Sequence, residues 1–354
     1  MRRARSQAWR RAAAVVGINV GVALGLLLLL EAGVRLARPD IGPAATDAAL
    51  VADRRFVDAT GRSTGLRPGA RGTSNGALFS IDARGFLRYR GNAALPDSAG
   101  AWLLLGDSVA MGIGVPPDAT FAGLLALSAD SVRVLNPSLI GYSHADYLRV
   151  LRTLLADDAL RIRRVTLVWC LNDPYPETGS RDPGQGLRTV AGGTVAALNR
   201  HSRLYRLLKS VALDRPLAYY EHDRQFYTPH ADALASARPA PDAPFYTDAL
   251  PSALESLAAM RALCAARAIP FEVVIVPYEP QLRPPSPGSV EGERLPQRLL
   301  LGHLETLGIP ALDLAPAFVA AAPDDPSTLF LWADGIHLSP RGHAVAAETL
   351  AVVR

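Results

Sequence analysis

The stretch "AWLLLGDSVAMGIG", residues 101–114, decides the fold. An uninterrupted apolar run of strand length ends at Gly106, and Asp107 and Ser108 follow at once. A strand that is apolar on both faces is typical of a parallel sheet covered by helices on both sides. Such sheets bind their ligands at the carboxyl ends of the strands. Ser108 is therefore either a nucleophile at a strand end or only a polar residue where a strand stops.

Four more apolar runs of strand length follow, separated by stretches with helical patterning. They are "VRVLNPS" (132–138), "RVTLVWCLND" (164–173), "PFEVVIVPYE" (270–279) and "IPALDLAPAF" (309–318). Right-handed crossovers between such strands predict an α/β fold, a three-layer α/β/α sandwich around a five-stranded parallel sheet.

The interval 174–247 breaks this rhythm and is expected to be an insertion. It contains one amphipathic stretch, "SRLYRLLKSVAL" (202–213), and the aromatic residues Tyr219, Tyr220, Phe226 and Tyr227. An insertion that emerges beside a strand end is either a lid or recognition arm or a structural excursion. The aromatic cluster is expected to form local core rather than a sugar-stacking platform.

Composition and charge exclude some classes of function. The 354 residues are 49% hydrophobic and 20% charged, which indicates a folded protein. The formal net charge is +4, but five arginines lie in the first eleven residues, so residues 12–354 carry a net charge of −1. The sequence therefore offers no basic face for nucleic acid, and no nucleic-acid partner is expected.

The arginines precede "AAAVVGINVGVALGLLLLL", Ala12 to Leu30, in which Asn19 is the one strongly polar residue. As a helix this segment would span about 28 Å, close to the hydrocarbon thickness of a bilayer. We expect a cytoplasmic tail over 1–11 and a single transmembrane anchor over 12–30 in the inner membrane. A cleaved or lipid-linked signal is the alternative. Both interpretations place the globular part outside the cytoplasm, in the periplasm or beyond the cell.

After the anchor we expect a juxtamembrane region with small strands over 31–98 and a catalytic domain over 99–354. The two cysteines, Cys170 and Cys264, each lie in an apolar context, which predicts two separate buried thiols. Two cysteines so far apart do not form a zinc site, and no metal is expected.

A serine hydroxyl becomes a nucleophile only when a base takes its proton and a third group orients that base. In "LWADGIHLSPRGH", Asp334 precedes His337 by three residues, so its carboxylate can reach the imidazole Nδ1 and leave Nε2 for Ser108. The alternative is a loop in which Asp334 caps a turn and His337 is merely exposed.

Acyl transfer by a serine nucleophile also needs hydrogen-bond donors for the developing oxyanion. The candidates are the N–H groups of Ser108 and of Gly141, in "NPSLIGYS", and the side-chain amide of Asn172, in "CLND". Taken singly, Gly141 is more often a turn glycine and Asn172 a cap at a strand end.

Together these residues carry a resemblance. Ser108, Gly141, Asn172 and His337, in this order, resemble the four signature blocks of the SGNH hydrolases, also called the GDSL esterase/lipase superfamily. The match covers about residues 101–354, and "SIDARGFLR" with the N-terminal span resembles the membrane-anchored bacterial members. The sequence departs from the pattern at Val109, where the family name has leucine, and at "CL" before Asn172, where a glycine is often found.

The resemblance implies a flavodoxin-like SGNH fold and a role for each matching residue. Ser108 would be the nucleophile, His337 the general base and acid, and Asp334 its orienting partner. Ser108, Gly141 and Asn172 would form the oxyanion hole. No cofactor is implied.

The activity expected is hydrolysis of esters through an acyl-enzyme, and the anchor suggests O-acyl or O-acetyl esters of cell-envelope glycans or lipids. One alternative is an O-acyltransferase that uses the same site, and another is a non-catalytic glycan-binding module of the envelope. His343 is expected to serve packing, whereas His144 lies either in the pocket or on the surface. Asp107 and Asp173 are expected to hold backbone at their turns.

Overall fold

The computed structural model describes most of the chain, and all structural statements below concern that part. The described residues are 2–38, 41, 46–52, 65–96, 98–129, 131–174, 197–199, 201–212, 214–227, 249–283 and 294–352. They form two compact units, Met1–Ala44 with Leu187–Leu213, and Ala45–Gly186 with Asp214–Arg354. Most of the expected insertion, including residues 175–196 and 228–248, lies outside the described residues.

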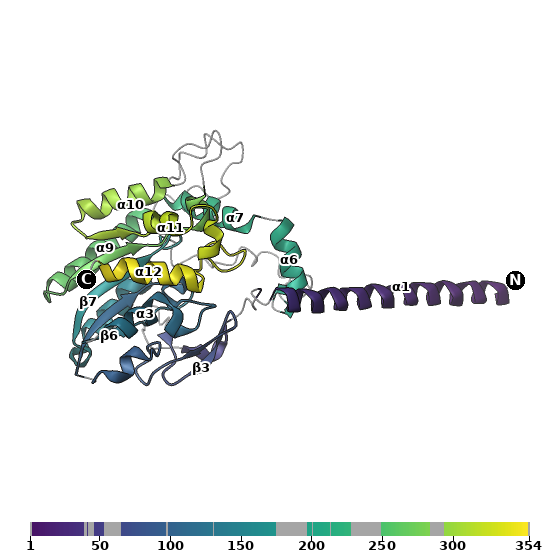
Figure 1. Cartoon of the computed structure of the whole chain (residues 1–354), viewed down its shortest axis with the longest axis horizontal. Coiled ribbons are helices and arrows are strands. Elements are labelled where there is room, and N and C mark those ends of the chain that lie inside the picture. The colour runs from purple at the N-terminus through teal and green to yellow at the C-terminus, as the bar shows by residue number, and fades with distance from the viewer. Residues whose placement is uncertain are drawn as a thin grey trace. The chain divides into compact units, whose positions relative to one another are not determined.

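The larger unit is built on a five-stranded parallel sheet, which confirms the predicted fold class (Figure 1). Its strands are β5 (Gly100–Leu105), β6 (Val132–Leu135), β7 (Ile162–Trp169), β8 (Phe271–Ile275) and β9 (Ala311–Asp313). The spatial order is β6-β5-β7-β8-β9. The chain therefore reverses direction across the sheet after β6, and the topological switch point lies between β5 and β7. Open sheets of this kind bind ligands at that point.

Helices cover both faces of the sheet. Because the step from β5 to β6 runs opposite to the later steps, right-handed crossovers place α3 (Phe121–Ser128) on one face. They place α4 (His144–Leu155) and α9 (Ala249–Ala265) on the other, where these two helices pack together. α12 (Pro340–Val352) returns to pack on α3. The remaining helices of this layer system are α10 (Leu295–Thr306), which contacts β9, and α11 (Ala315–Ala321), which contacts α12.

Short antiparallel strands precede the sheet. β1 (Val51–Ala52) pairs with β2 (Gly65–Leu66), and β3 (Arg71–Ser74) pairs with β4 (Ala77–Ser80). Phe79 and Leu66 are fully buried and join the hydrophobic core of the sheet domain. These strands belong to the larger unit by their contacts. The division of the chain at residue 98 remains a prediction.

The described end of the insertion is fastened to the carboxyl edge of the sheet. It comprises α7 (Arg215–Asp223) and a short turn that ends at Tyr227. The Tyr278 hydroxyl, just after β8, donates to Asp223 at 2.6 Å, and Trp169 at the end of β7 donates to the Tyr227 hydroxyl at 2.9 Å. Tyr220, like Tyr227, is buried. Tyr220, Phe226 and Tyr227 thus form local core, as expected, whereas Tyr219 is 38% exposed.

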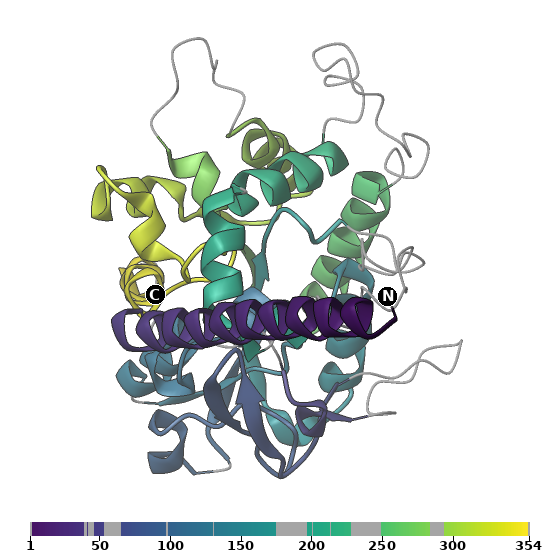
Figure 2. The ribbon, with the colours of Figure 1, turned by 90° about the vertical axis from the view of Figure 1, so that its right-hand side faces the viewer.

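The smaller unit contains α1 (Arg2–Ala37) and α6 (Arg203–Ala212), the latter close to the predicted helix at 202–213. Within α1, the segment Ala14–Ala37 is long enough and, with a mean hydropathy of 2.2, apolar enough on average to cross a bilayer. The two helices contact each other. Figure 2 shows α1 and α6 from a second direction.

Candidate active site

Ser108 is placed by a tight strand-to-helix turn at the end of β5. A side chain at Gly106 would put its Cβ 2.4 Å from the Cβ of Ala110, so only glycine fits there. Asp107 then caps the one-turn helix α2 (Ser108–Met111) by accepting the Val109 N–H at 2.8 Å. This confirms the backbone-holding role expected of Asp107. The turn leaves Ser108 mostly buried, with 7% of its surface exposed.

His337 reaches Ser108 from the loop before α12. Its Nε2 lies 2.9 Å from the Ser108 Oγ, and its Nδ1 lies 2.8 Å from Oδ1 of Asp334. Since an ionised carboxylate only accepts, Nδ1 carries the proton, and the Ser108 hydroxyl can then donate to Nε2. The three side chains are thus joined in one line of hydrogen bonds. His337 is therefore not merely exposed, although Asp334 does cap a turn, as the alternative held.

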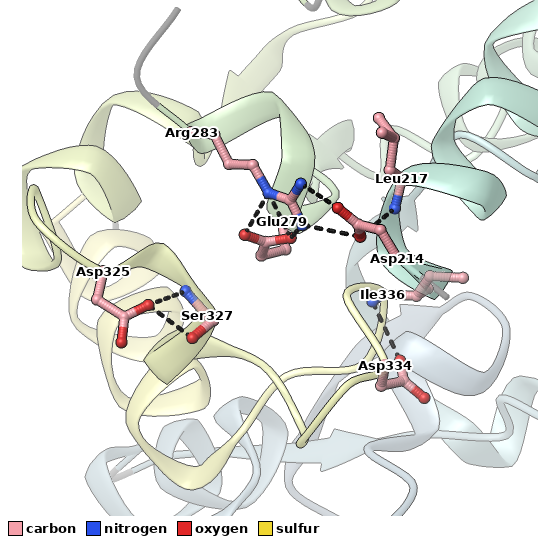
Figure 3. A network of polar contacts seen from close by, with 8 residues as sticks. All are labelled: Asp214, Leu217, Glu279, Arg283, Asp325, Ser327, Asp334 and Ile336. Carbon is pink, nitrogen blue, oxygen red and sulfur yellow. Dashed lines mark hydrogen bonds and ion pairs between the residues drawn. The ribbon is translucent and has the colours of Figure 1, made fainter. Parts of the chain in front are cut away.

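Asp334 is itself held by the backbone of its own loop. Its Oδ1 accepts the Ile336 N–H at 3.1 Å (Figure 3). The same oxygen accepts the His337 N–H at 2.8 Å. The carboxylate therefore caps a turn and orients the imidazole at once. Burial raises the pKa of Asp334, but the charge and hydrogen bonds of His337 outweigh it and lower that pKa below its usual range.

The surroundings of His337 shift its pKa in opposite directions. Burial alone lowers the pKa of this imidazole, but the Asp334 charge and hydrogen bond, with a smaller contribution from Asp107, leave it raised. An imidazole with a raised pKa is a stronger base toward the Ser108 hydroxyl. Below that pKa the imidazole is protonated and cannot take the proton.

Residues of other elements hold the loop that carries Asp334 and His337. The Glu279 N–H donates to the Gly335 carbonyl at 2.8 Å. The Arg283 guanidinium bridges Glu279, at 2.7 Å, and Asp214, at 2.6 Å, and Asp214 in turn caps α7 by accepting the Leu217 N–H (Figure 3). These bonds tie together α7, the turn after β8 and the loop that carries His337.

Asn172 lies at the end of β7, across the switch point from Ser108. Its Nδ2 donates to Oδ2 of Asp107 at 3.3 Å, the same oxygen that lies 3.3 Å from the Ser108 Oγ. The side-chain amide therefore reaches the immediate surroundings of the nucleophile. The bond from Asn172 to Asp107 is long, so the amide can exchange it for a substrate oxygen.

Gly141 lies in the turn between β6 and α4 and is exposed. Its φ of +85° is in the left-handed region that favours glycine. Because β6 neighbours β5, this turn leaves the sheet at the same edge as Ser108. The position of Gly141 at this end of the sheet is established, and its role in the oxyanion hole remains a prediction.

Two features of the site were not foreseen from the sequence. The Cys170 thiol donates to Oδ1 of Asn172 at 2.8 Å and so fixes which way the amide points. The Tyr147 hydroxyl donates to Asp173 at 2.5 Å, and Asp173 accepts the Cys170 N–H at 2.7 Å. Burial, followed by the charge of Asp173, raises the pKa of Tyr147, so it remains a donor. In the sequence, only the position of Cys170 next to "LND" could have hinted at this network.

Asp107, Cys170 and Asp173 present ligand atoms within 4.8 Å of one another, which is the spacing of a metal site. Each of them is already engaged by hydrogen bonds within the protein. Cys170 and Cys264, both in the described part of the chain, are buried and form no disulfide, as predicted.

The two other histidines that the sequence singled out are both buried. His343 is buried, and its Nδ1 accepts the Phe121 N–H at 3.2 Å, which joins α12 to α3. Burial lowers the pKa of His343 to about 3, so it stays neutral. His144 is also buried and its Nδ1 shares a hydrogen bond of 2.9 Å with the Ser256 hydroxyl. A surface position for His144 is therefore wrong.

Comparison with known proteins gives likenesses of fold. No protein-family profile matches the chain, and no curated protein matches it. Among solved structures, it is similar to a member of the lipolytic protein G-D-S-L family from Veillonella parvula, at 13% identity and a TM-score of 0.40, over 72% of this chain and 98% of that one. TesA is 16% identical, with a TM-score of 0.39 over 71% of this chain and 96% of that one.

A lipase/acylhydrolase from Enterococcus faecalis is 14% identical, with a TM-score of 0.39 over 72% of this chain and 94% of that one. Likenesses at this level carry no argument about activity. The argument about activity rests instead on the order of the sheet and on the contacts among Ser108, His337 and Asp334.

Proposed function

We propose that this chain is a membrane-tethered, extracytoplasmic serine ester hydrolase of the SGNH type. The observation that carries the proposal is the line of hydrogen bonds from the Ser108 hydroxyl through His337 to Asp334, at 2.9 and 2.8 Å. Ser108 lies 229 positions before His337 in the chain. Nucleophilic catalysis requires a nucleophile, a base that takes its proton and a group that orients the base. The fold brings Ser108, His337 and Asp334 together in these positions at the switch point of its sheet.

The reaction begins when the Nε2 of His337 takes the Ser108 proton and the Oγ attacks the ester carbonyl carbon. The carbonyl oxygen gains negative charge and accepts hydrogen bonds from the oxyanion hole, formed by the N–H groups of Ser108 and Gly141 and the Nδ2 of Asn172. Asp334 stabilises the imidazolium that forms and keeps its orientation. The imidazolium then protonates the departing alkoxide, which leaves an acyl group on Ser108.

Water then hydrolyses the acyl-enzyme, and His337 again acts first as base and then as acid. His337 takes a proton from the water as its oxygen attacks the acyl carbon, and returns that proton to the Ser108 Oγ as the acid departs. The whole cycle uses side chains and backbone of this chain. No metal or organic cofactor takes part in it.

The proposed location suggests the substrate. The apolar run of α1, which ends before Glu31, follows an arginine-rich segment, and arginines remain on the cytoplasmic side of a membrane. A catalytic domain tethered outside the cytoplasm meets esters of the cell envelope. We therefore propose O-acyl or O-acetyl esters of envelope glycans, or acyl lipids, as the substrate class.

The proposal is tested with purified full-length protein in detergent and short-chain aryl acetates, followed by acetate release from O-acetylated envelope polysaccharide. Wild type should hydrolyse the esters and Ser108→Ala should not. Activity of Ser108→Ala equal to that of wild type would refute the site. Adding a glycan acceptor to the assay separates hydrolysis from acyl transfer, because transfer would yield acylated glycan in place of free acid.

A further inference from the structure

α6 is amphipathic and joins the smaller unit through its first turn. Successive residues of a helix are separated by about 100°. On this spacing Leu204, Leu207 and Leu208 fall on one side of α6, and its cationic residues Arg203, Arg206 and Lys209 fall on the other. Leu208, which belongs to the apolar side, is 58% exposed.

A single carboxylate of α1 binds the start of α6. Oε1 of Glu31 accepts the Arg203 N–H at 3.0 Å, and Oε2 accepts the Leu204 N–H and the Ser202 hydroxyl, each at 2.9 Å. The Arg203 and Leu204 N–H groups are among those that a helix leaves without partners in its first turn. A carboxylate at this end is also favoured by the helix dipole. Glu31 therefore caps α6 from another helix.

The cationic side of α6 adds bonds to the end of α1 and the residues after it. The Arg203 guanidinium donates to the carbonyl oxygens of Arg35 at 3.2 Å and Arg38 at 3.3 Å. Arg206 donates to the carbonyl of Ile41 at 2.8 Å. The first turn of α6 is thus fixed against residues 31–41 at several points.

The attachment lies at a defined level along α1. Glu31 directly follows "GLLLLL" and is the first charged residue after the apolar run that begins at Ala12. If α1 spans a bilayer, Glu31 lies where the hydrocarbon ends and the headgroups begin. Both ribbon views show α6 running across α1 rather than along it (Figures 1 and 2). A helix that crosses a spanning helix at this level lies along the membrane surface.

We propose that α6 is an interfacial helix that binds the outer surface of the membrane that α1 spans. Its leucine side, including the exposed Leu208, enters the boundary between headgroups and acyl chains. The cationic side, which is fixed against residues 31–41, faces away from the hydrocarbon at the level of the phospholipid headgroups. This inference rests on the proposed membrane span of α1. It does not depend on the proposed esterase activity.

The test places an environment-sensitive fluorophore on each side of α6 in the full-length protein. Leu208→Cys carries the label on the apolar side. Ser210→Cys, about 200° further around the helix, is the matched control. The parent chain, whose two cysteines are buried, measures background labelling. Each labelled protein is reconstituted in vesicles of phosphatidylcholine and phosphatidylglycerol, with or without lipids that carry a quencher near the headgroup.

The label at position 208 should emit at shorter wavelength and be quenched about threefold more than the label at position 210, because only the former enters the bilayer boundary. Equal, water-like emission from both positions overturns the interfacial helix. Retention in the vesicles at alkaline carbonate shows separately whether α1 spans the membrane. Release by carbonate overturns both the span and the interfacial helix. Hydrolysis of an aryl acetate by the same samples reports the esterase activity independently.

Discussion

Gly335 lies between Asp334 and His337, and its replacement by alanine tests how accurately this loop must be held. Its φ is +75°, and an added Cβ would lie 2.4 Å from the Cβ of Pro216, the second residue of α7. Carbon atoms in contact prefer about 3.5–4.0 Å, so the loop or α7 must move by about 1 Å or more. A shift of about 1 Å in a catalytic group costs about 10²-fold in rate.

We therefore expect Gly335→Ala to lower kcat for an aryl acetate about 10²-fold, which is a barrier increase of about 2.7 kcal/mol. The matched control is Gly69→Ala, because Gly69 has φ +72° but nothing within 4 Å of the added Cβ. The control bears the same backbone strain without the collision, and its kcat should match wild type. Circular dichroism and thermal unfolding of both variants check the fold. A Gly335→Ala enzyme that is folded and within threefold of the wild-type kcat would refute this reasoning.

Three further predictions follow from the contacts of the site. Ser108→Ala and His337→Ala should each lose at least about 10³-fold in kcat, and the double variant should be hardly worse than the worse single one, because the two groups act as one unit; losses that multiply in the double variant would contradict this. Asp334→Asn should lose about 10⁴-fold in kcat. It should also move the acidic limb of the kcat/KM profile to lower pH, since Asp334 raises the pKa of His337 and activity needs the neutral imidazole; an unmoved limb in a full pH profile would argue against that electrostatic role. Cys170→Ala should lower kcat about tenfold with KM little changed, because Asn172 loses the donor that orients it, while Cys170→Ser should restore most of the rate; steady-state kinetics of both variants decides.

The sheet and the serine at its switch point could be predicted because the signals are local. Each strand lies in a mostly apolar run, and Gly106, Asp107 and Ser108 follow the first of them directly. The short spacing of Asp334 and His337 likewise predicted a contact that the structure contains.

The contacts that support the site could not be predicted, because they join residues with no common pattern in the sequence. Nothing in the sequence around Arg283 or Asp214 indicates that they bridge α7 to the turn after β8. The bond from Cys170 to Asn172 depends on side-chain rotamers at the end of β7. The capping of α6 by Glu31 joins residues 171 or more positions apart. Such contacts arise from tertiary packing, which periodicity and spacing do not encode.

The central claim is that Ser108 is a nucleophile activated by His337. The most direct measurement is the reaction of the full-length protein with a fluorophosphonate, with the modified residue located by mass spectrometry of the digested protein. We predict one adduct, on Ser108, that forms in wild type, is absent from Ser108→Ala and forms much more slowly in His337→Ala. A folded wild-type protein that gains no adduct, or an adduct that persists undiminished in Ser108→Ala, would contradict the claim.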